Sequence, residues 1–160
     1  MKTRFAVPED ASAIAKIYNQ GIEDRVATFE TEPRTAADIQ SWLSKHYTVV
    51  VVEEGDDIIA FAATFPYRKR QCYVGVREFS VYVERSARGK GAGRLAVETL
   101  ITASRKRGEW KLLSRVFPEN GASLKLLRNL GFREVGTYKN HARLDGEWRD
   151  VVIVELLIDR

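Results

Sequence analysis

A basic, glycine-rich loop is the part of this sequence whose residue types and spacing point most directly to chemistry. The residues before it favour a strand, and those after it place apolar side chains on one helical face. A helix N-terminus there would offer free backbone N–H groups and a positive dipole end, which bind anions. The loop therefore predicts a phosphate site, although glycines also occur at turns and helix caps that bind nothing. Its residues are Arg88, Gly89, Lys90, Gly91, Ala92 and Gly93.

A carboxylate precedes this loop on the same predicted strand. Because strand side chains alternate between two faces, Glu78 shares a face with Ser80 and Tyr82. A carboxylate near a phosphate site can act as a general base that takes a proton from a nucleophile. It can equally form an ion pair with Arg77 or another cation on a solvated face, and the charge pattern alone favours that simpler reading.

The elements that must position these residues follow from hydrophobic periodicity and turn residues. We expect the order strand, two helices, three strands, helix, strand, helix and two strands. The strands are predicted at residues 5–7, 48–53, 58–65, 73–83, 112–116, 132–138 and 151–158. The helices are predicted from Pro8 to about Gln20, from Thr35, from Arg94 to Gly108, and from Pro118 to Gly131. Residues 22–34 form a long linker that is either a functional loop or an inert connection.

Two common nucleotide-binding motifs do not match the loop. A dinucleotide fold needs G-x-G-x-x-G directly after a strand and an acidic residue further on, and the spacing here differs. A P-loop needs Ser or Thr after Gly-Lys, whereas Gly91 follows Gly89-Lys90. Neither of these two nucleotide-binding readings therefore fits the loop.

The loop resembles the Q/R-x-x-G-x-G/A signature of the GNAT acetyltransferase superfamily. The later segments Asn120-Gly121-Ala122-Ser123 and Leu130-Gly131-Phe132 resemble its second conserved element. Segments spread over most of the chain are similar to the phosphinothricin acetyltransferase group: residues 17–19, 28–30, 78–83 and 145–150. Residues 18–23 and 28–31 lean toward its arsinothricin branch.

The resemblance implies an α/β (α+β) fold, with a mixed central sheet of about six to seven strands and about four flanking helices. It also implies an N-acetyltransferase that uses acetyl-CoA, with a small amino acid or amino-acid-like toxin as substrate. In the family the loop from Arg88 to Gly93 holds the pyrophosphate. The backbone of Val81, Tyr82 and Val83 would pair with the pantetheine amides, and Asn120 and Ser123 would open a helix beside the pantetheine. A homodimer is the expected assembly.

The same resemblance assigns catalytic and substrate residues. Glu78 becomes the general base, directly or through water, and a backbone N–H near Val81 would bind the developing oxyanion. Arg68, Arg70 and Arg77 would bind the substrate's anionic groups, and Phe29, Glu30 and Tyr73 would line its pocket. The arginines can equally be solvated surface residues, and Phe29 and Tyr73 can equally be core residues. The family often places a Tyr in the late helix to protonate the thiolate, but this chain has Leu127 there. Water, another group or Tyr138 would have to serve.

Composition sets the remaining limits. With 160 residues, 44% of them hydrophobic, the chain fits a single domain over residues 1–160. The one cysteine, Cys72, and the absence of a long apolar stretch favour the cytoplasm and no membrane span. His46 and His141 lack metal-site spacing, so no metal is expected.

Two other functions stay open. One is acetylation of a protein or peptide amine by the same fold. The other is nucleic-acid binding, suggested by the net charge of +4 and the basic runs 68–70 and 105–107. These runs lack interleaved aromatics, so we expect no nucleic-acid partner.

Overall fold

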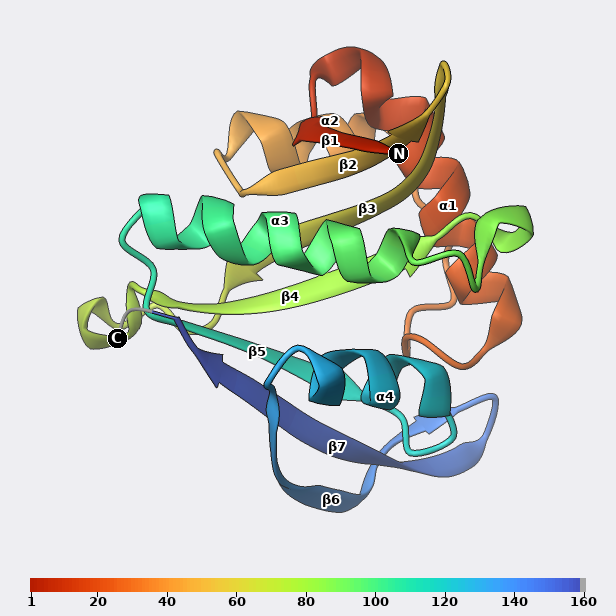
Figure 1. Cartoon of the computed structure of the whole chain (residues 1–160). Coiled ribbons are helices and arrows are strands. Elements are labelled where there is room, and N and C mark those ends of the chain that lie inside the picture. The colour runs from red at the N-terminus through yellow and green to blue at the C-terminus, as the bar shows by residue number, and fades with distance from the viewer. Residues whose placement is uncertain (159–160) are drawn as a thin grey trace.

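The computed structural model describes residues 1–158 of the chain. Its centre is a seven-stranded sheet with the strand order β1-β2-β3-β4-β5-β7-β6 (Figure 1). Only β4 and β5 are parallel neighbours; the other pairs are antiparallel. The strands are β1 (Lys2–Phe5), β2 (Val49–Glu54), β3 (Asp57–Pro66), β4 (Val76–Val83), β5 (Lys111–Val116), β6 (Arg133–Leu144) and β7 (Glu147–Leu157). The helices are α1 (Ala11–Asp24), α2 (Ala36–Ser44), α3 (Ala92–Lys106) and α4 (Gly121–Asn129).

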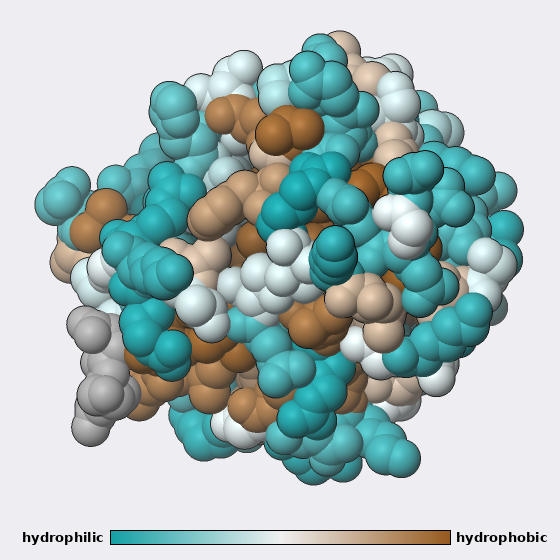
Figure 2. All heavy atoms as spheres, turned by 45° about the horizontal axis from the view of Figure 1, so that its top comes forward, coloured by the Kyte–Doolittle hydropathy of each residue, from teal (hydrophilic) through white to brown (hydrophobic). Residues whose placement is uncertain are grey.

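Helices cover both faces of the sheet, which is why β2 is a run of valines. Val49 and Val51 pack toward α1 and α2, whereas Val50 and Val52 pack toward α3. α3 and α4 lie together in front of the sheet in Figure 1. The face of the molecule shown in Figure 2 is mainly hydrophilic, with separate hydrophobic patches. The fold thus has three layers, helices on each side of one sheet.

The predicted order of elements is confirmed, and so is the predicted fold class. Two local sequence patterns account for the start of a helix and for a turn. Thr35 and Asp38 form a reciprocal capping box at the start of α2, with hydrogen bonds of 3.2 and 2.8 Å. Asp145 and Gly146 both have positive φ in the tight turn between β6 and β7.

Several predicted boundaries were wrong. The first strand is Lys2–Phe5 rather than residues 5–7, because it pairs along β2, where neither apolar alternation nor burial marks it. β4 begins at Val76 because residues 71–73 form a short 3-10 helix. α1 continues to Asp24, where Arg25 ends it in a left-handed conformation. β6 and β7 are longer than predicted, since their polar ends continue the hairpin up to its turn.

The parallel ladder between β4 and β5 stops early. It joins only Val76–Glu78 to residues 111–113, although β4 continues to Val83 and stays paired with β3 on its other edge. Beyond Glu78, the hydroxyl of Ser114 donates to the carbonyl oxygen of Phe79 at 3.0 Å. The later backbone groups of β4 therefore face an opening between two strands of the sheet.

The start of that ladder depends on a glycine, Gly75, which has no side chain. A Cβ at Gly75 would lie 2.1 Å from the indole ring of Trp110, and the Gly75 carbonyl accepts hydrogen bonds from the N–H groups of Trp110 and Lys111. Gly75 thus lets the strands approach closely just before they diverge.

A glycine in α1 makes comparable room on the other face of β4. A Cβ at Gly21 would lie 2.6 Å from the ring of Tyr82. That ring cannot easily move, because it is buried between Tyr18 and Phe61, with centroids 4.9 and 5.5 Å away.

We expect Gly21→Ala to lower the free energy of unfolding by about 1–3 kcal/mol through overpacking, despite alanine's higher helix propensity. Denaturant unfolding would measure the loss. Gly121→Ala is the matched control, since nothing lies within 4 Å of its Cβ position. The control should be neutral or stabilising by up to about 1 kcal/mol. Equal effects of the two substitutions would contradict the packing argument.

Candidate active site

Two adjoining hollows lie where β4 and β5 separate. We call the smaller one, about 40 Å³, the inner hollow, and the larger one, about 210 Å³, the outer hollow. They share Ala27, Ser80, Tyr82, Ser114 and Arg115, so they adjoin, and we refer to the two together as the cavity. The inner hollow is also lined by Val81, Val116, Asn120, Ser123 and Leu127. The outer hollow is also lined by Tyr18, Thr28, Phe29, Glu30, Phe65, Glu78, Phe79, Phe117 and Val151.

Glu78 lines the outer hollow at the last residue of the β4–β5 ladder. Its Oε1 lies 2.7 Å from Nη1 of Arg115, which comes from β5. The Glu78 side chain is 25% exposed. Glu78 thus has a cationic partner, Arg115 rather than Arg77, and it is also open to a ligand in the cavity.

The segment between α1 and α2 covers the outer hollow. Asn19 holds its far end: the Asn19 side chain accepts from the Arg34 N–H at 2.7 Å and donates to the Arg34 carbonyl at 3.0 Å. The ring of Phe29 packs edge-on against Phe117, with centroids 4.8 Å apart. These contacts hold Phe29 and Glu30 over the cavity, so the long linker is an ordered wall of the site.

The glycine-rich loop leads into α3 at the other end of β4. Gly91 is the N-cap of α3 with φ 90°, and it provides no side-chain acceptor for the first helical N–H groups. A Cβ at Gly93 would lie 3.0 Å from Leu126 and 3.2 Å from Val83, so glycine lets α3 pack closely on its neighbours. The arrangement leaves N–H donors at a positive helix end, as an anion site requires.

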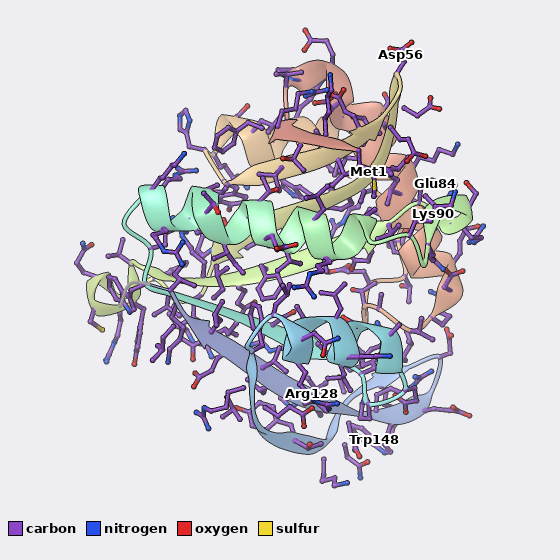
Figure 3. All side chains as sticks on the ribbon, viewed as in Figure 1. Met1, Asp56, Glu84, Lys90, Arg128 and Trp148 are labelled. Carbon is purple, nitrogen blue, oxygen red and sulfur yellow. The ribbon has the colours of Figure 1, made fainter. Side chains whose placement is uncertain are left out.

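Side chains from α1 hold the segment before this loop. The Gln20 amide donates to Glu84 at 3.1 Å and accepts from the Arg85 N–H at 2.8 Å. Asp24 binds both Arg85, at 2.9 Å, and Arg88, at 2.8 Å. Figure 3 shows Glu84 and Lys90 on this part of the chain, ahead of α3. The loop is therefore anchored to the end of α1.

A further polar cap starts α4. The Asn120 side chain accepts a hydrogen bond from the Ser123 N–H at 3.2 Å, which places both residues on the inner hollow. Leu127 lies one helical turn after Ser123. It is 1% exposed and lines the same hollow. The wall formed by α4 therefore carries no ionisable group at that position.

The comparisons with known proteins agree with this geometry. Residues 14–132 match the Acetyltransferase (GNAT) family. This chain belongs to that GNAT family. It is 31% identical to a phosphinothricin N-acetyltransferase of Streptomyces coelicolor, over 97% of this chain and 95% of the relative. It is 28% identical to a methionine sulfoximine/methionine sulfone acetyltransferase of Salmonella typhimurium, over 99% of this chain and 95% of the relative.

A solved structure adds the cofactor. A GNAT superfamily phosphinothricin acetyltransferase from Sinorhizobium meliloti, in complex with acetyl-CoA, superimposes with a TM-score of 0.91. It is 28% identical, and the match covers 98% of this chain and 88% of that one. As a GNAT member, the chain is an acetyl-CoA-dependent N-acetyltransferase.

The residues present suit the cofactor of a GNAT enzyme. The backbone groups on the unpaired edge of β4 can form hydrogen bonds with the pantetheine amides, as they would with an added strand. The uncapped start of α3 can receive the pyrophosphate. Two of the predicted ligands already have partners within the protein: Arg88 binds Asp24, and its Nε donates to the Val83 carbonyl at 3.3 Å. The roles of Arg88 and Val83 toward the cofactor stay predictions.

The structure does not bring all of the predicted substrate residues to Glu78. Phe29 and Glu30 line the outer hollow with it. Arg68, Arg70 and Tyr73 surround separate depressions at the β3–β4 connection. Arg77 points to the opposite face of β4 from Glu78, and its Nε donates to the buried Glu109 at 2.8 Å.

Tyr82, which lines both hollows, and Tyr138, the tyrosine considered as a proton donor, differ in their surroundings. Burial, followed by the nearby Tyr18, raises the pKa of Tyr82 far above its ordinary value, so its phenol stays protonated. Tyr138 is 52% exposed on the edge strand β6, where it stacks on His141, and it lines neither hollow.

The sequence analysis missed Arg115, Ser114 and Phe117. For Arg115 the sequence did contain a signal: strand alternation puts its side chain on the face of β5 opposite the buried Leu112. Only the structure shows that β5 brings it to Glu78. In residues 1–158 no cluster of His, Cys, Asp and Glu has the geometry of a metal site, and no helix is long and apolar enough to span a membrane.

The anchor of the glycine-rich loop depends on pH. The hydrogen bond from the Ser86 hydroxyl, followed by that from the Gln20 amide, lowers the pKa of Glu84 to about 2. Since the folded protein has the lower pKa, the unfolded chain binds more protons in acid. The stabilisation from Glu84 is complete above the ordinary glutamate pKa of about 4.3 and is lost as the pH falls toward about 2.

We therefore expect Glu84→Gln to melt below the wild type at pH 7, and this difference to shrink steadily between pH 5 and about pH 2.5. Thermal unfolding across that range would measure it. Glu98→Gln, which removes an exposed carboxylate of α3 paired with Arg94, is the control and should show a much smaller change. A melting difference that is the same at pH 7 and pH 2.5 would contradict the assignment.

Proposed function

We propose that this enzyme transfers the acetyl group of acetyl-CoA to the α-amine of a small amino acid or amino-acid-like toxin. Phosphinothricin, methionine sulfoximine and arsinothricin represent the substrate class. The observation that carries the proposal is Glu78, which lines the outer hollow at the point where β4 opens away from β5. The relatives named above, which act on phosphinothricin and on methionine sulfoximine or sulfone, support the same class.

The size of the cavity favours a small amine over a peptide. The outer hollow, about 210 Å³, is smaller than the roughly 300–1,000 Å³ of pockets that hold drug-sized ligands. The loop that carries Phe29 closes one side of it against Phe117. A peptide acceptor would need a groove that extends past this wall.

Glu78 supplies the proton acceptor that the reaction needs. An α-ammonium group is largely protonated near neutral pH and must lose a proton before it can attack. Bound acetyl-CoA supplies the thioester carbonyl as the acetyl donor. The ammonium group gives one proton to the Glu78 carboxylate, directly or through water, and the resulting amine forms the new C–N bond as the C–S bond breaks. The second proton that the nitrogen loses neutralises the departing CoA thiolate, so that the products are the amide and free thiol. A backbone N–H near Val81 is proposed to bind the negative charge on the carbonyl oxygen.

The remaining site assignments belong to the same proposal. The pyrophosphate is proposed to bind to the glycine-rich loop, which consists of Arg88, Gly89, Lys90, Gly91, Ala92 and Gly93. Val81, Tyr82 and Val83 are proposed to bind the pantetheine by their backbones, beside Asn120 and Ser123. Phe29 and Glu30 are proposed to line the substrate site. Arg68, Arg70, Tyr73 and Arg77 stay predictions without support from the cavity.

We also propose that residues 1–160 form a single domain, that the protein is a homodimer, and that it is located in the cytoplasm. The face of β5, β7 and β6 that carries Leu157 and Tyr138 supports the dimer, because both side chains are about half exposed there and α1 and α2 pack on the β1–β4 half of the sheet. Sedimentation velocity of the wild type and of Leu157→Asp would test it. A monomeric wild type would overturn the dimer.

The activity is tested with purified protein, acetyl-CoA and an assay for free thiol. Phosphinothricin, methionine sulfoximine, methionine sulfone and arsinothricin form one panel, and common amino acids and a peptide with a free N-terminus form another. Turnover of the small amino acids and not of the peptide is expected. Activity on the peptide alone would favour the other acceptor class, and binding of DNA or RNA at low salt would contradict the absence of a nucleic-acid partner.

We expect Glu78→Gln to lower kcat by about 10²–10⁴-fold, because glutamine cannot accept the proton. Steady-state kinetics between pH 6 and 9 should show that the pH–rate profile of the remaining activity differs from that of the wild type, because the general base is missing. Acetyl-CoA affinity and the melting temperature serve as controls and should change little. Near-normal turnover with an unchanged pH–rate profile would show that Glu78 is not the base.

A further inference from the structure

Arg115 lines the cavity but has no role in the proposed reaction as described above. It lines both the inner and the outer hollow, and it is the one Lys or Arg among the lining residues of either hollow in residues 1–158. Its side chain is 39% exposed. A substrate that enters the outer hollow therefore meets a single cation, and this cation already contacts Glu78.

The guanidinium of Arg115 has donors to spare. It carries five N–H groups, and within residues 1–158 the hydrogen bond from Nη1 to Glu78 is the one that it donates. Its planar edge matches the two oxygens of a carboxylate, which arginine binds through two parallel hydrogen bonds. Arg115 can therefore bind a second carboxylate within the cavity.

The charges of the outer hollow match those of a free amino acid. Its lining offers two carboxylates, Glu30 and Glu78, and one guanidinium, Arg115. Glu30 has a partner outside the lining, Arg34, at 3.2 Å. Glu78 and Arg115 are thus a juxtaposed negative and positive charge, and an α-amino acid carries an ammonium and a carboxylate on one carbon.

We propose that Arg115 binds the α-carboxylate of the substrate and thereby determines specificity for free amino acids. The inference rests on the proposed function. Binding of that carboxylate gives Arg115 a second anionic partner, so that Glu78 turns from Arg115 to the substrate's ammonium group. The base becomes available when an acceptor with a carboxylate next to its amine is present. An amine without that carboxylate leaves Glu78 paired with Arg115.

The test compares methionine sulfone with its primary carboxamide, which keeps the amine and removes the negative charge. The wild type should prefer the acid in kcat/KM. Arg115→Met should reduce this acid/amide preference by about 10–100-fold, the value of hydrogen bonds to a charged group, and Arg115→Lys should keep part of it. Comparing ratios between variants cancels the difference in basicity of the two amines.

Arg149→Met is the matched control. Arg149 lies on β7, its guanidinium is 5.4 Å from the centroid of Phe117, and it lines neither hollow. This variant should keep the wild-type acid/amide preference. Melting temperature and acetyl-CoA affinity establish that each variant is folded.

A binding measurement separates recognition from a purely structural ion pair. The probe is the des-amino analogue of methionine sulfone, which has the carboxylate but no amine. In calorimetry it should bind Glu78→Gln several-fold more tightly than the wild type, because Arg115 has lost its resident counter-ion. An ion pair that only stabilises the fold would give equal or weaker binding.

The outcomes distinguish this inference from the proposed function. A wild type that acetylates no member of the amino-acid panel, methionine sulfone included, overturns both. A wild type that acetylates methionine sulfone, with an acid/amide preference that is unchanged in folded Arg115→Met, overturns the role of Arg115 alone. Weaker binding of the des-amino probe to Glu78→Gln would also overturn it.

Discussion

The divergence of β4 from β5 is the constraint on which the rest of the structure depends. A parallel pair that continued beyond Glu78 would use the backbone groups of β4 for its own ladder and would close the space between the strands. Because the ladder ends there, β4 keeps one paired edge, toward β3, and one free edge. The same strand can then present Glu78 at one end of the opening and lead into the glycine-rich loop at the other.

The last turns of α1 hold the two loops that complete the site. Asn19 binds the end of the α1–α2 linker, while Gln20 and Asp24 bind the segment from Glu84 to Arg88. These polar contacts follow one another along a helix whose apolar side is buried against β3 and β4. Gly21 lies among them and allows Tyr82 to pack against the helix. The two loops, one proposed to bound the acceptor site and the other to hold the cofactor, are thus fixed to the same helix.

The sequence predicted the order of elements because this order depends on local patterns. Hydrophobic periodicity, the Thr35–Asp38 cap and the Asp145–Gly146 turn each involve residues close together in the chain. The pairing of Glu78 with Arg115 joins residues 37 positions apart, and it depends on where a parallel ladder ends. Local composition also misled in one case: Arg77 adjoins Glu78 in sequence, yet strand alternation sends it to the opposite face, to Glu109.

The distribution of charge in the cavity bears on what the enzyme accepts. The chain has a net charge of +4, but the lining of the outer hollow has two acids and one base, so the overall excess of cations does not extend into it. An ammonium group is therefore favoured near Glu78 and Glu30, and an anion is favoured at Arg115 alone. A peptide N-terminus brings the ammonium without an adjacent carboxylate and would leave Arg115 with Glu78 as its one anionic neighbour. A free amino acid satisfies both charges, and this electrostatic match, together with the small volume of the hollow, favours it as the acceptor.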